Sequence, residues 1–247
     1  MCDTEPGAEA AQAGRPTTLR QTLRHETAFE VLRLAIPTYT RHRDRVARLA
    51  ASEPEEALTI ARRIEEPWFR CQALAHVAYH CAGLAKKNEI LGESFRAALE
   101  SRAPNRVVSV SAWPLKVLCK SGQNDKLTVE VERLLVIIAG EPSPVRRADA
   151  LNQVLGAVLS GPRALFWRVF DQFREACLAP LMSGKRNRKG ESRLAHWVVV
   201  VDRFDPARAR QVMEAVNGPT LRQQALRALR EHKNTEPESW CAWPYLG

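Results

Sequence analysis

Apolar residues recur through most of the chain at spacings of three and four, the pattern of helices that bury one side. One clear stripe begins at Cys71 and continues through Leu74, Ala75, Ala78 and Cys81. Equivalent stripes run through Ala148, Leu151, Leu155 and Val158, and through Leu226 and Leu229. Few of the β-branched, turn-punctuated runs typical of strands interrupt this pattern. The sequence therefore predicts an all-α fold.

Prolines divide the apolar pattern into helices. Pro54 and Pro206 follow the acidic residues Glu53 and Asp205, so each is predicted to take the first helical position. There the missing N–H costs nothing and the preceding acid suits the helix dipole. Because proline breaks a helix interior, three further prolines are predicted to open the partner helices: Pro67, Pro144 and Pro219.

The motif Pro-x-x-Arg-x-x-Ala-Leu begins at each of these last three prolines. Pro54 to Leu74 also aligns with Pro206 to Leu226 without a gap, and the separation fits four units of about 38 residues. Such a period is typical of arrays in which each unit completes the core of its neighbour. We therefore predict an α-solenoid of stacked antiparallel helical hairpins, wound as a right-handed superhelix.

Composition changes along the chain and suggests its organisation. Residues 1–18 carry acids and small residues with little to bury, which is typical of a disordered leader. The helical-repeat domain is predicted over residues 19–232, interrupted by an irregular basic insertion over residues 180–192. An aromatic C-terminal tail is expected over residues 233–247.

The net charge and the cysteines indicate which partners and which cellular compartment to expect. The net charge of +9 favours an anionic partner, whether nucleic acid, an acidic protein or a membrane surface. The six cysteines form no Cys-x-x-Cys pair, so they are expected to be reduced thiols. No run reaches the roughly 18 apolar residues of a membrane span, and the N-terminus does not resemble a signal peptide. A cytoplasmic protein without a membrane span is expected.

The unit has features of a known repeat family. Glu55-Glu56-Ala57-Leu58, followed by Ala61, Ile64 and Pro67, resembles the second helix and terminal proline of a tetratricopeptide repeat. Leu74, Ala75 and Ala78 fall where that family has its first-helix Leu, small residue and aromatic, although Ala78 is not aromatic. The chain is thus similar to a tetratricopeptide-like array, and a HEAT-like helical repeat remains an alternative.

The resemblance implies a binding surface. First helices of tetratricopeptide repeats line a concave face that binds peptides or protein segments. The matching positions here are Phe69, Gln72, His76, Tyr79, His80, Leu115, Lys116, Asp149 and Gln153. We expect these residues to bind a protein or peptide partner.

Two patterns could carry chemistry. His76 and His80 have the i, i+4 spacing of a metal-binding pair, but Val77 stands where a zinc protease needs glutamate, so no metal site is predicted. Arg70 and His76 fit the Arg-x4-6-His pattern of HEPN ribonucleases. Arg147 and Arg222 repeat the arginine while Gln153 and Ala228 replace the histidine, which favours a structural role for Arg70.

No cofactor motif is present, so the sequence favours a non-catalytic protein-interaction module acting through its concave face. The first alternative is a nucleic-acid-binding repeat protein, in which phosphates would contact Lys185, Arg186, Arg188 and Lys189. The fainter alternative is a helical ribonuclease that uses Arg70 and His76.

Overall fold

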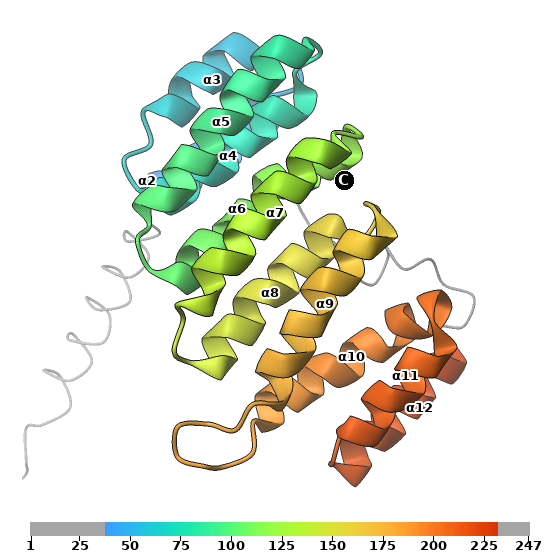
Figure 1. The fold of residues 1–247 in the computed structure, drawn as a ribbon. Helices are drawn as coiled ribbons and strands as arrows, with labels where there is room; N and C mark the ends of the chain where they lie inside the picture. The colour runs from blue at the N-terminus through green and yellow to red at the C-terminus, as the bar shows by residue number, and fades with distance from the viewer. Residues whose placement is uncertain (1–37, 232–247) are drawn as a thin grey trace, which may run out of the picture.

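The structure is a computed structural model that describes residues 38–231. Within that range the chain forms eleven α-helices and no strand, so the predicted all-α class is confirmed there (Figure 1). The helices in chain order are α2 (Thr38–Leu49), α3 (Pro54–Arg62), α4 (Pro67–His80), α5 (Leu84–Glu100), α6 (Pro104–Lys120), α7 (Asn124–Ala139), α8 (Pro144–Val158), α9 (Arg163–Leu178), α10 (Arg188–Phe204), α11 (Pro206–Ala215) and α12 (Pro219–Glu231). The predicted leader and aromatic tail lie outside the described residues.

The helices form two layers (Figure 1). The even-numbered helices pack side by side in chain order from α2 to α12. Each odd-numbered helix from α3 to α9 packs against both of its even-numbered neighbours, and α11 packs against α10. Most connections are loops of a few residues, so consecutive helices run antiparallel. The core therefore lies between the layers and continues along the array, since each hairpin covers the next.

The predicted prolines do open helices. Pro54, Pro67, Pro144, Pro206 and Pro219 are the first residues of α3, α4, α8, α11 and α12, and Pro104 opens α6 in the same way. The predicted acidic caps differ from each other. The Asp205 carboxylate accepts hydrogen bonds from the N–H groups of Ala207 and Arg208, whereas the Glu53 side chain makes no cap. The shorter aspartate is the side chain that N-caps favour.

The repeated arginine has a structural partner. Arg70 Nη1 donates to the Ile64 carbonyl oxygen at 2.9 Å, and Arg222 Nη2 donates to the Val216 carbonyl oxygen at 3.0 Å. Both acceptors lie six residues earlier, just after the preceding helix, where backbone carbonyls lack helical partners. Arg70 also pairs with a carboxylate, that of Glu100 at the end of the following helix, α5.

The central helix α6 is buried along most of its length. Every residue from Val110 to Cys119 is buried, including Pro114 in the helix interior. Proline at position 114 cannot donate to the carbonyl of Val110. The Cys71 thiol of α4 lies 3.5 Å from that oxygen as a donor, and Ser94 of α5 donates to the Cys71 carbonyl. This network joins three helices at the core of the array.

The segment predicted as a basic insertion is partly helical, since α10 begins at Arg188. Asn187 caps α10 by accepting from the N–H of Gly190, and its amide donates to the Ala176 carbonyl of α9. A Cβ at Gly190 would lie only 2.4 Å from the Cys177 carbonyl oxygen. The two helices thus approach each other here more closely than a side chain would permit.

Candidate functional site

The predicted α4 residues share one side of that helix. Cys71 faces α5 through Ser94, and Phe69, Gln72, His76 and His80 lie opposite because they are spaced three and four apart. The guanidinium of Arg43 on α2 lies 5.6 Å from the Phe69 ring centroid and donates to Gln72 Oε1 at 3.1 Å. The first helix of the described array therefore covers the start of this row.

The row on α4 meets a second row on α6. The ring centroids of His76 and Trp113 are 5.2 Å apart, and the Lys120 amine lies 5.4 Å from the Tyr79 ring centroid. Lys116 lies between Trp113 and Lys120 on the same side of α6, because the three are spaced three and four apart. We call this surface the α4–α6 face; it comprises Phe69, Gln72, His76, Tyr79, His80, Trp113, Lys116 and Lys120.

Exposure varies across the α4–α6 face. His80 and Lys120 are exposed and Tyr79 is half-buried, whereas Gln72 and His76 are buried. Leu115 was predicted beside Lys116 but is fully buried in the core. Trp113 and Lys120, which sequence reasoning did not single out, complete the face because helical spacing carries it along α6.

Burial and the nearby Arg43 cation lower the pKa of His76 to about 4. The pKa is lowered because burial penalises the charged imidazolium. His76 is therefore neutral near pH 7 and can offer either a hydrogen-bond donor or an acceptor.

Lys116 stands out electrostatically on the α4–α6 face. Its side chain is only 7 % exposed, yet it makes no hydrogen bond or ion pair with another residue of the described range. A lysine can bury its carbon stem in this way while its charged end stays at the surface. An amine in this position suits an anionic group supplied by a partner.

Of the two predicted α8 residues, Asp149 contacts α10. Asp149 pairs with Arg193 and lies 3.8 Å from the Lys189 amine, while Gln153 is exposed. Next to them, Asn152 accepts a hydrogen bond from the Trp197 indole at 2.7 Å. Within residues 38–231, no recorded interaction joins Asp149 or Gln153 to the α4–α6 face.

Two of the four cations in the predicted phosphate-binding cluster pair with carboxylates of the protein itself. Arg186 donates to both carboxylate oxygens of the buried Glu191, and Lys189 lies near Asp149. Lys185 and Arg188 are exposed and make no side-chain interaction with the described residues. The cluster therefore offers two of its four cations to a ligand.

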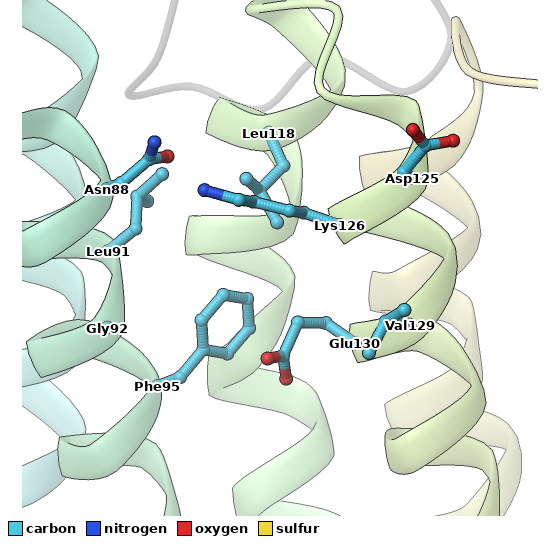
Figure 2. A pocket seen from close by; sticks show the side chains of 9 residues that line it. All are labelled: Asn88, Leu91, Gly92, Phe95, Leu118, Asp125, Lys126, Val129 and Glu130. Carbon is cyan, nitrogen blue, oxygen red and sulfur yellow. The ribbon is translucent and has the colours of Figure 1, made fainter. Parts of the chain in front are cut away.

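An apolar groove opens between α5 and α7 on the opposite layer (Figure 2). It has a volume of 370 Å³, and α6 forms its floor with Leu118. Figure 2 shows Lys126 reaching from α7 toward the α5 side, above Phe95 and Glu130. The residues that line the groove are Asn88, Leu91, Gly92, Phe95, Leu118, Asp125, Lys126, Val129 and Glu130. Sequence reasoning did not find this groove; its only local signal was Leu91 and Phe95, four residues apart.

Neither a metal centre nor a membrane span is found in the described range. Among residues 38–231, His, Cys, Asp and Glu side chains form no group of three or more that could hold a metal ion. No helix in that part of the chain has the length and apolar character needed to cross a bilayer.

Searches for relatives of the chain found no matching family model, curated protein or solved structure. The assignment of a function therefore depends on the geometry of the chain alone.

Proposed function

We propose that the protein is a non-catalytic interaction module whose α4–α6 face binds a segment of another protein. The observation that carries this proposal is Lys116, whose side chain is only 7 % exposed and makes no ion pair with another described residue, beside aromatic and neutral polar side chains. A carboxylate of the bound segment would supply the missing charge, and Tyr79 and Trp113 would offer ring surfaces to its neighbouring side chains.

The proposal includes the wider architecture. The helices pack against neighbours in chain order, which supports an α-solenoid of tetratricopeptide-like or HEAT-like hairpins. In a right-handed superhelix of the tetratricopeptide type, the even-numbered layer would line the concave side. The α4–α6 face would then lie within that concave surface.

Binding of nucleic acid is the principal alternative, and the net charge of +9 favours it. Two of the four clustered cations already pair with Glu191 and Asp149, which weakens the cluster as a phosphate site. A ribonuclease centred on Arg70 and His76 has less support. Arg70 is held by backbone carbonyls and Glu100, and His76 packs against Trp113.

Two double variants in an affinity capture from nuclease-treated native lysate test the proposal. Lys116→Gln with His80→Ala alters the α4–α6 face, and Lys185→Gln with Arg188→Gln removes the two unpaired cations of the basic cluster. We expect the wild type to capture a discrete protein that the first variant loses and the second retains. Capture of nucleic acid alone, released by moderate salt and lost with the second variant, would favour the alternative.

A further inference from the structure

The junction between α5 and α7 differs from the other junctions of the odd-numbered layer. Ion pairs cross each of the others. Arg62 of α3 pairs with Glu93 of α5 at 2.6 Å. Arg168 of α9 donates to Glu132 of α7 at 2.9 Å, and Arg208 of α11 lies 3.5 Å from Asp171 of α9. Among the described residues no ion pair or hydrogen bond joins α5 to α7, and the apolar groove lies there instead.

The shape of the groove depends on a glycine and three apolar side chains. Leu91 and Phe95 of α5 face it, and Leu118 of α6 closes its floor (Figure 2). A Cβ at Gly92 would meet only the Arg96 guanidinium, at 3.6 Å. The wall at position 92 is thus open, so an entering apolar side chain would find space there.

Two cations lie at or beside the rim of the groove. Arg96 on α5 and Lys126 on α7 are exposed and make no side-chain hydrogen bond or ion pair with another described residue. Of the two acids that line the groove, Glu130 lies 3.8 Å from Arg133, and Asp125 lies in the first turn of α7, where the helix dipole favours a negative charge. Each side of the groove thus presents one cation with which a ligand carboxylate can pair, Arg96 on α5 and Lys126 on α7.

Exposed apolar side chains extend this surface along α7. Val129 is 67 % exposed at the groove and Val136, seven residues further on, is 77 % exposed. A spacing of seven places both on the same side of the helix, about 10 Å apart. The surface is thus an elongated strip with an apolar centre, which suits an amphipathic helix laid along it.

We propose that the α5–α7 groove binds an amphipathic helix of a partner protein. Apolar side chains of that helix pack against Leu91, Phe95 and Leu118, and its acidic side chains meet Arg96 and Lys126. This site lies on the layer opposite the α4–α6 face and does not depend on the function proposed for that face.

The probe is a pool of fluorescent helical peptides of about 14 residues, which span about 20 Å. Two anchor positions four residues apart carry every combination of Leu, Ile, Met and Phe, and Glu and Ala fill the rest. A matched pool has Lys in place of Glu. Binding to the full-length protein is measured by fluorescence anisotropy.

Two variants test the two parts of the proposal. Gly92→Leu places a side chain in the groove, with Gly83→Leu as a control because a Cβ there has no neighbour within 4 Å. Arg96→Glu with Lys126→Glu reverses the rim charge. Thermal unfolding shows that each variant is folded before binding is measured.

We expect the wild type to bind members of the Glu pool in preference to the Lys pool. Gly92→Leu should raise Kd by about tenfold or more, and Gly83→Leu should leave it unchanged. Charge reversal should transfer the preference to the Lys pool. Lys116→Gln, which alters the α4–α6 face, should have no effect, so loss of one site is distinguished from loss of the other.

Three results would overturn the proposal. The first is that no member of either pool binds, and the second is that Gly92→Leu and Gly83→Leu bind equally well. The third is a concentration-dependent dimer, seen by sedimentation, that Gly92→Leu abolishes; the groove would then be an interface between two copies of this chain.

Discussion

At the residue scale, the cationic side chains differ in role because they differ in the groups that they contact. Arg70 and Arg222 occupy equivalent places in two units and both donate to a carbonyl oxygen six residues earlier. At the equivalent place in the unit between them, the buried Nε of Arg147 has no hydrogen-bond partner among the described residues, and the neighbouring Arg146 pairs with the buried carboxylate of Glu141. Lys116 lies on the α4–α6 face and makes no ion pair or hydrogen bond with another described residue, whereas Arg70, Arg146 and Arg222 bind groups of the fold itself.

His76 makes stability depend on pH. Its folded-state pKa of about 4 lies below the usual value near 6.5, so the unfolded chain binds more protons between these values. The contribution of His76 is therefore complete above about pH 6.5 and is lost as pH falls toward 4. Over that range we expect the free energy of unfolding to fall by about 2 to 3 kcal/mol more in the wild type than in His76→Gln.

Urea unfolding of both proteins at several pH values between 4 and 7 measures this difference. Carboxylates contribute equally to the two proteins, so the comparison isolates His76. Parallel pH profiles would show that His76 is not shielded from water as the structure indicates.

At the element scale, proline determines where a helix starts, and the small residues that follow it within the helix allow close packing. Pro67 opens α4, and Cys71, Ala75 and Ala78 then bring it close to its neighbours. Pro114 shows the opposite use of proline, since it lies inside α6 and leaves the Val110 carbonyl to Cys71 of α4. Pro114 removes one hydrogen bond within α6 and so leaves the Val110 carbonyl oxygen able to accept from α4.

The two acidic caps give a matched test at this scale. Asp205→Ala removes two hydrogen bonds to the first turn of α11, and we expect it to lower the free energy of unfolding by about 1 kcal/mol. Glu53→Ala, at the equivalent position before α3, removes no cap and should change stability by less than about 0.5 kcal/mol. Denaturant unfolding of both variants measures the difference, and equal losses would contradict it.

At the scale of the whole molecule, the array is held together by neighbours in chain order. Such arrays open locally, since each unit depends mainly on the adjacent ones. The end of the described range has the least support: Ala225 is the only buried residue of α12, whereas α6 is buried from Val110 to Cys119. Stability should therefore rise from α12 toward the centre.

Amide hydrogen exchange tests this gradient. We expect the α12 amides to exchange through local opening long before those of α6, whose exchange requires the central helices to separate. Peptide-resolved mass spectrometry measures both in one experiment. Equal protection of α6 and α12 would mean that the whole array opens as a single unit.

Local patterns determined the helical class and the positions of the helix starts. Apolar spacing and proline act within one or two turns, so Pro54, Pro67, Pro144, Pro206 and Pro219 could be placed without knowing their neighbours. The resemblance to tetratricopeptide repeats selected Phe69, Gln72 and His76, and helical spacing puts the three on one side of α4.

Only the tertiary structure decided what those side chains meet. It buried Leu115 while leaving Lys116 unpaired, turned Asp149 toward α10, and bound Arg70 to Glu100 of the following helix. The α5–α7 groove likewise exists because two helices that are not consecutive lie side by side without a bridging ion pair. Such features depend on the separation of packed helices, which no single helix encodes.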